Sequence, residues 1–143
     1  MLKTGRMADD LRIEPTPPSL EDYLALRWLS GLSPKNPEQG VPALANSWGW
    51  RRAVDETGRS VAMGRVVGDG GWYFLIADMA TLPEYQKRGL GRRILTGLLE
   101  EIRTRAPEGA YVTLLADPPG QRLYRSLGFE EPTNGSVTMH RVM

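Results

Sequence analysis

The chain has 143 residues, enough for one domain with a hydrophobic core and too few for two, so we expect a single domain at residues 10–143 after a flexible leader at residues 1–9. Its net charge of +1 provides no strong field, which argues against nucleic acid or a membrane as a partner. The absence of cysteine excludes disulfides, a cysteine nucleophile and thiolate metal sites, and it fits a reducing, cytoplasmic location.

The first part of the chain alternates between helical and strand-like patterns. Ser19 is a good N-cap for one helix, and Asn36 followed by a proline marks the start of a second. From Trp48 onward the pattern has a period near two, and glycine-rich turns separate the runs. The expected elements are a strand at 11–14, helices at 20–30 and 36–45, and an antiparallel meander of strands at 48–54, 61–67 and 72–81.

The second part begins with the clearest helical pattern of the chain. Apolar residues from Ile94 to Ile102 form one stripe, which predicts an amphipathic helix at about 90–105. The remaining expected elements are a strand at 110–116, a helix from Asp117 to Gly128 and a last hairpin from Phe129 to Val142. This order predicts an α+β or mixed α/β domain.

A loop with two glycines joins the third meander strand to the amphipathic helix. The strand stops at Pro83, and Gly89 and Gly91 lie where the helix begins. Unpaired N–H groups at a helix start, the helix dipole and the small size of glycine all favour close approach of phosphate oxygens. The loop therefore predicts an anion cradle for a pyrophosphate. The alternative is a glycine-rich turn that only caps the helix.

The charges around this loop favour the cradle. Cations near a helix N-terminus oppose the helix dipole, and a bound polyanion would relieve that conflict. The four cations are Lys87, Arg88, Arg92 and Arg93. The spacing matches neither a nucleoside-triphosphate P-loop nor the Rossmann fingerprint, because Ile94 stands where the third Rossmann glycine belongs.

Two motifs in this region resemble those of the GNAT superfamily of acetyl-CoA-dependent N-acetyltransferases. One is the loop Gln86–Gly91, entered through Leu82–Tyr85, and the other is the helix end Leu123–Phe129. The resemblance implies a GNAT-like fold, in which a mostly antiparallel twisted sheet with a splayed parallel strand pair is flanked by about four helices. The strand expected at 110–116 would be the one that splays away.

The resemblance also implies an activity. The chain would transfer the acetyl group of acetyl-CoA, its cosubstrate, to a primary amine of a small molecule or peptide by direct attack, without a metal and in the cytoplasm. Such domains often form homodimers. Two alternatives stay open: a catalytically silent acyl-CoA-binding sensor or subunit, and acetylation of charged tRNA, against which the near-neutral charge argues.

The resemblance assigns acetyl-CoA contacts by position. The pantetheine arm would pair with the end of the strand before the loop, and the loop amides would hold the pyrophosphate. The expected contacts are Met79, Ala80 and Thr81 for the arm, and Gln86, Lys87, Arg88, Gly89, Leu90, Gly91 and Arg92 for the pyrophosphate.

Tyr124 stands where the family often keeps a tyrosine near the thioester sulfur, and it would protonate the departing thiolate as general acid. Its alternative role is packing beneath the sheet. Asp78, an acid in an apolar run, is the candidate base, although a structural aspartate bonded to backbone at a strand bulge is favoured. Asp117 replaces a frequent family asparagine and is expected to act mainly as a helix cap.

Other conspicuous side chains are expected to be structural. Trp48 and Trp50 fit packing on the sheet, with an acceptor pocket as the alternative. His140 has no serine or metal-ligand cluster to support a triad or a zinc site. The acceptor depends on residues 15–50, where no recognisable code appears.

Overall fold

The computed structural model describes residues 10–143, so the leader predicted at residues 1–9 lies outside the described residues. The chain divides into two compact units, the first ending at Thr113 and the second running from Leu114 to Met143. The single domain expected over residues 10–143 stays a prediction. Among the described residues, none of the helices combines the length and apolar character that a membrane crossing requires.

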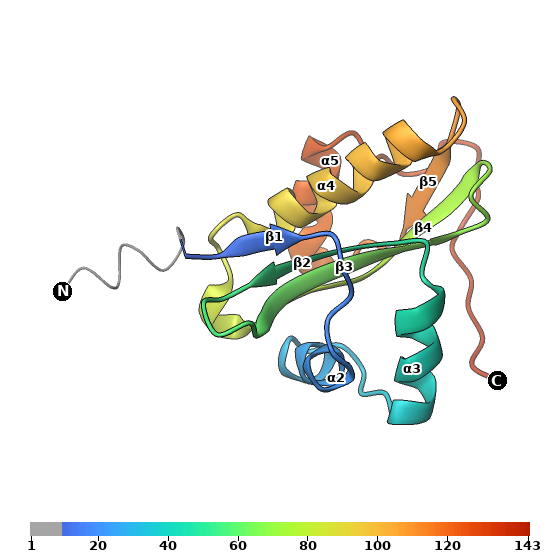
Figure 1. The fold of residues 1–143 in the computed structure, drawn as a ribbon. Helices are drawn as coiled ribbons and strands as arrows, with labels where there is room; N and C mark the ends of the chain where they lie inside the picture. The colour runs from blue at the N-terminus through green and yellow to red at the C-terminus, as the bar shows by residue number, and fades with distance from the viewer. Residues whose placement is uncertain (1–9) are drawn as a thin grey trace. The chain divides into compact units, whose positions relative to one another are not determined.

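A five-stranded sheet forms the centre of the first unit (Figure 1). Its strands, in spatial and chain order, are β1 (Arg12–Glu14), β2 (Gly49–Val54), β3 (Ser60–Gly68), β4 (Tyr73–Thr81) and β5 (Tyr111–Leu114). The first four pair antiparallel, and for β2, β3 and β4 this confirms the predicted meander. The Tyr111 N–H donates to Trp72 O at 2.7 Å and Thr113 Oγ1 to Phe74 O at 3.3 Å, so β5 runs parallel to β4.

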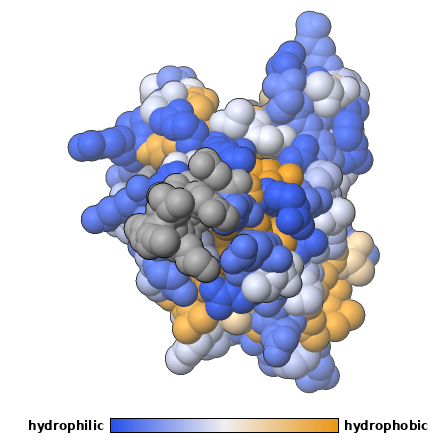
Figure 2. Space-filling model, turned by 60° about the vertical axis from the view of Figure 1, so that its left-hand side comes forward, coloured by the Kyte–Doolittle hydropathy of each residue, from blue (hydrophilic) through white to orange (hydrophobic). Residues whose placement is uncertain are grey.

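Helices cover both faces of this sheet (Figure 1). The helix α4 (Leu90–Arg105) packs on β2 and β3, while α2 (Leu20–Leu29) packs on β3 and β4 from the other side, with α3 (Pro37–Asn46) beside it. The predicted starts are confirmed, because Ser19 caps α2 and Asn36 forms a capping box with Gln39 in α3. On the face drawn in Figure 2, hydrophilic residues surround smaller hydrophobic areas.

The ladder between β3 and β4 contains a β-bulge. Met63 pairs with Ala80 and Arg65 with Ala77, so Gly64 faces both Asp78 and Met79. Asp78 has a φ of 56°, a left-handed conformation that is uncommon for a residue other than glycine. A Cβ on Gly64 would lie 2.5 Å from Met79 Sδ, so glycine is what lets the bulge pack closely at this point.

The second unit has less regular structure than the sequence predicts. A 3-10 turn, η2 (Pro118–Gly120), leads into α5 (Gln121–Ser126), but no strand follows between residues 127 and 143. The predicted last hairpin is therefore wrong. Its first arm is cut short by Pro132, which cannot donate to a ladder, and the second arm leaves Val137 75% and Met139 87% exposed.

Candidate active site

The loop before α4 presents its backbone to solvent. Lys87 and Gly89 have φ values of 63° and 80°, both left-handed. Gly89 is the N-cap of α4 and offers no side chain to the first-turn N–H groups, which have no intrahelical acceptor. A Cβ on Gly89 would meet nothing within 4 Å. The helix start therefore leaves open space over backbone donors, which is the form of an anion-binding nest.

Contacts on the inner side hold this loop in place. The short turn η1 (Pro83–Tyr85) buries the Tyr85 ring, and the Arg88 guanidinium lies 5.3 Å from the centre of that ring. Gln86 Nε2 donates to Thr81 O at 3.1 Å, which ties the loop to the end of β4. The Gln86 side chain thus anchors the loop to β4, while residues 86–89 remain exposed to solvent.

Positive charge predominates at the start of α4. No acidic residue lies in the first turn of α4, and all four neighbouring cations are exposed. The positive end of the helix dipole adds to their charge. This arrangement suits a ligand that carries several negative charges, such as a pyrophosphate.

The end of β4 leads directly into the cradle and extends past β5. Met79, Ala80 and Thr81 form the last three residues of β4, and on one side they pair with β3. On the other side β5 starts opposite Trp72 and has only four residues. At about 3.3 Å per residue, β5 ends well before Met79. An extended ligand arm could therefore approach the edge at Met79–Thr81.

Asp78 lies at the bulge in a buried cluster of charged and polar side chains. Its Oδ2 accepts from Tyr23 OH at 2.6 Å and from Arg65 Nε at 2.8 Å, and its Oδ1 accepts from Arg27 Nη1. The Asp78 side chain is 6% exposed. Burial, and then the hydrogen bond to Asp78, raise the pKa of Tyr23 to about 12, so its phenol stays protonated and donates.

The two arginines extend this cluster to the N-terminal helices. Arg27 also donates from Nε and Nη2 to Ser33 O, at 3.1 and 2.7 Å, and Arg65 Nη1 donates to Ser47 Oγ at 3.1 Å. The cluster therefore connects α2, the residues that flank α3, β3 and the β4 bulge. Sequence reasoning missed both arginines. The available signal was Arg27, placed four residues after Tyr23 and thus on the same side of α2.

Tyr124 lies on α5 in the second unit. Its ring meets Phe129 edge-on, with ring centres 6.2 Å apart, and packs against the backbone of Gly120. Burial, and then the nearby Asp117 carboxylate, raise the pKa of Tyr124 above its ordinary value. The expected cap is wrong, because the Asp117 side chain makes no capping hydrogen bond: Pro118 and Pro119 have no N–H, and the Gly120 N–H donates to the Asp117 backbone carbonyl at 2.9 Å.

Trp48 and Trp50 pack against other side chains of the first unit, and His140 lies in an irregular segment. Trp50 is 4% exposed and meets Tyr23 edge-on at 5.9 Å, while Trp48 lies 4.9 Å from the Phe74 ring and 3.9 Å from the Arg105 guanidinium. His140 is exposed in the irregular segment rather than in a strand. Among residues 10–143, no three His, Asp or Glu side chains gather as a metal site would require.

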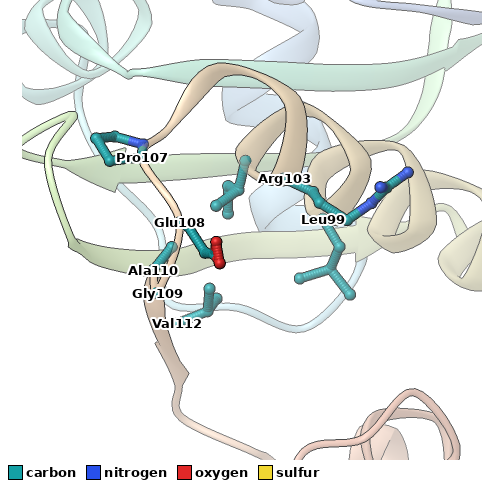
Figure 3. A pocket seen from close by; sticks show the side chains of 8 residues that line it. Leu99, Arg103, Pro107, Glu108, Gly109, Ala110 and Val112 are labelled. Carbon is teal, nitrogen blue, oxygen red and sulfur yellow. The ribbon is translucent and has the colours of Figure 1, made fainter.

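A groove of about 470 Å³ lies at the far end of α4 (Figure 3). In the figure, Leu99 and Arg103 extend from the helix, and the other wall comes from the segment Pro107–Val112. Since α4 has 16 residues and an α-helix rises about 1.5 Å per residue, roughly 20 Å separate its two ends. The groove is therefore not part of the cradle.

Comparisons with known proteins agree with this geometry. Residues 50–131 match the family model of the acetyltransferase (GNAT) domain. The chain is 31% identical to GCN5-related N-acetyltransferase 1, chloroplastic, of Arabidopsis thaliana over 57% of this chain and 40% of that protein. It is 35% identical to the [ribosomal protein bS18]-alanine N-acetyltransferase of Salmonella typhimurium over 56% of this chain and 53% of that protein. The match thus spans about half or less of these relatives.

Solved structures resemble the chain over nearly its whole length. A probable acetyltransferase from meticillin-resistant Staphylococcus aureus has a TM-score of 0.86 and 35% identity, and the match covers 93% of this chain and 99% of that one. A GNAT family protein from Streptococcus pneumoniae has a TM-score of 0.74 and 28% identity, over 93% and 98% of the two chains.

Proposed function

The chain belongs to the GNAT acetyltransferase family, and we propose that it transfers the acetyl group of acetyl-CoA to a primary amine of a small molecule or peptide by direct attack. Members of this family generally use acetyl-CoA. The observation that carries the proposal is the open start of α4, where Gly89 leaves the backbone uncovered and four cations surround it. The donor pyrophosphate would bind there, at Gln86–Arg92.

The pantetheine arm would lie along the end of β4. Met79, Ala80 and Thr81 lead into the cradle and reach past β5, so their edge is open to an extended ligand. An arm that carries amide groups would bind this edge as an added strand does, through backbone hydrogen bonds. This arrangement would bring the thioester near the β4 bulge.

Tyr124 would act as the general acid. The acceptor nitrogen attacks the thioester carbonyl, the carbon–sulfur bond breaks, and the departing thiolate takes the phenol proton. The acceptor nitrogen loses its proton to water. The raised pKa of Tyr124 favours this role, because a phenol that titrates above its ordinary value of about 10 holds its proton at neutral pH.

For Asp78 we propose a structural role rather than that of the base. An ionised carboxylate accepts about four hydrogen bonds. Here Tyr23, Arg27 and Arg65 already supply three, and the side chain is almost entirely buried. An incoming amine would have little access to it.

The acceptor, the compartment and the assembly belong to the proposal as well. Among the relatives, one is named for an alanine of a ribosomal protein and another, from Oryza sativa, for serotonin, so both protein and small-molecule amines occur as acceptors in this family. We propose the cytoplasm as the compartment, since a chain without cysteine suits it, and a homodimer as the assembly.

Thiol release from acetyl-CoA, followed against a panel of amines, tests the proposal. We expect amine-dependent release, with mass spectrometry showing one added acetyl group on the acceptor. Saturable acetyl-CoA binding without turnover across a broad panel would instead identify a silent acyl-CoA-binding subunit. Failure to bind acetyl-CoA at all would overturn both.

A further inference from the structure

The buried cluster at the β4 bulge contains more positive than negative charge. Arg27 and Arg65 both pair with Asp78, and neither forms an ion pair with any other acid among the described residues. Tyr23 is neutral. The Arg27 and Arg65 side chains are only 10% and 19% exposed, so one positive charge is left without a counter-charge in a largely buried place. Such a charge is costly unless an anion joins it.

The two arginines differ in what remains available. Arg27 uses all three guanidinium nitrogens on Asp78 and Ser33. Arg65 uses Nε on Asp78 and Nη1 on Ser47, while its Nη2 has no protein partner within residues 10–143. Arg65 is also the more exposed of the pair. The open donor and the excess charge therefore coincide on Arg65.

This donor lies beside the expected reaction centre. Arg65 pairs across the sheet with Ala77 and holds Asp78, the residue directly before Met79. Met79–Thr81 is the edge proposed for the pantetheine arm. The residues around α2 and α3 that the cluster joins also belong to the segment on which the acceptor was expected to depend.

We propose that Arg65 binds a carboxylate of the acceptor, so that the substrate class is an amine that also carries a carboxylate, such as a free amino acid. This inference rests on the proposed acetyltransferase function. The guanidinium suits the group, because its planar donors match the two oxygens of a carboxylate. A net positive site also disfavours the ammonium form of an acceptor bound near it, so a larger fraction of that amine is neutral and able to attack the thioester.

The wild-type protein provides the first test. Thiol release would be measured with the common protein amino acids, each against its own carboxamide. We expect kcat/KM to be at least about tenfold higher for the acid, the effect of one charge-assisted hydrogen bond. Equal or better turnover of the carboxamides overturns the proposal. A preference for phosphoethanolamine over both members of every pair also overturns it, in favour of a phosphate-bearing acceptor.

Two variants test whether Arg65 causes the preference for the acid over the carboxamide. Arg65→Gln should reduce the acid-to-amide ratio to near one, with the dissociation constant of acetyl-CoA unchanged. Arg27→Gln is the matched control, because it breaks a pair with the same Asp78 but leaves Arg65 Nη2 open, and it should keep a preference for the acid. If both variants lose the ratio equally, Arg65 acts only through the structure of the cluster. Arg65→Lys, which keeps the charge, should retain part of the ratio if Arg65→Gln does not fold.

A binding measurement separates this proposal from the proposed activity. Calorimetry with 3-phenylpropionate, an acid without an amine, on protein saturated with CoA requires no turnover. Binding that Arg65→Gln abolishes supports the carboxylate site even if no acceptor reacts. Absence of binding, together with turnover of amines that lack an acid, would refute the site and leave the acetyltransferase function standing.

Discussion

Gly89→Glu is the most direct test of the cradle. The left-handed backbone at Gly89 costs a residue with a Cβ about 1–2 kcal/mol, which for 143 residues lowers Tm by about 3–7 °C. The new side chain also occupies the open space above the first turn of α4 and places a carboxylate there. A charge-assisted hydrogen bond contributes about 1.5–3 kcal/mol, so losing one should raise the acetyl-CoA dissociation constant about 10- to 150-fold.

The control separates strain from loss of the ligand site. Gly58 lies in the turn between β2 and β3, with a φ of 90°, and a Cβ at this position would likewise meet nothing within 4 Å. Gly58→Glu should therefore destabilise the fold by a similar amount and leave acetyl-CoA affinity unchanged. Calorimetry gives the affinities and thermal unfolding gives Tm for both variants. If Gly89→Glu folds and binds acetyl-CoA as tightly as wild type, the reasoning about the cradle is wrong.

Three further predictions concern the tyrosines and the buried aspartate. Tyr124→Phe should lower kcat by about 100-fold or more without changing acetyl-CoA affinity. Because the pKa of Tyr124 is raised, its phenol should stay protonated, and the rate of the wild-type enzyme should not fall through ionisation of Tyr124 below about pH 10. Tyr23 has a folded pKa of about 12 against about 10 unfolded, so its contribution to stability is complete below pH 10 and is lost as pH rises toward 12; the difference in unfolding free energy between wild type and Tyr23→Phe should shrink over that interval, and a constant difference would contradict the shift. Asp78→Asn removes the counter-charge of the buried Arg27 and the partly buried Arg65, and it should lower the free energy of unfolding, measured with denaturant, by about 3–5 kcal/mol. Glu100→Gln, at an exposed surface pair, should change it little.

Local patterns predicted most of the first unit. The helix α4 spans the residues, about 90–105, that the apolar stripe predicted, and the loop before it is one continuous stretch, so the conformation of that loop depends on neighbours in sequence. In each case the determining residues are close together along the chain.

Contacts between distant residues were not predictable in this way. The partners of Asp78 come from 13, 51 and 55 residues away, so one sequence gives no sign that they meet. The expected structural aspartate bonded to backbone is in fact bonded to side chains. The prediction of the last hairpin was wrong for another reason. Alternating apolar and polar residues form a strand only where a neighbouring strand pairs with them, and here Val137 and Met139 remain exposed.

The four cations at the start of α4 give ionic strength opposite effects on the stability of the fold and on the binding of an anionic ligand. Without a ligand, Lys87, Arg88, Arg92 and Arg93 repel the positive end of the helix, and dissolved salt screens that repulsion and favours the folded chain. With the proposed pyrophosphate bound, the same screening would weaken the attraction between these cations and the ligand. We therefore expect added salt to stabilise the ligand-free protein and to lower its affinity for acetyl-CoA.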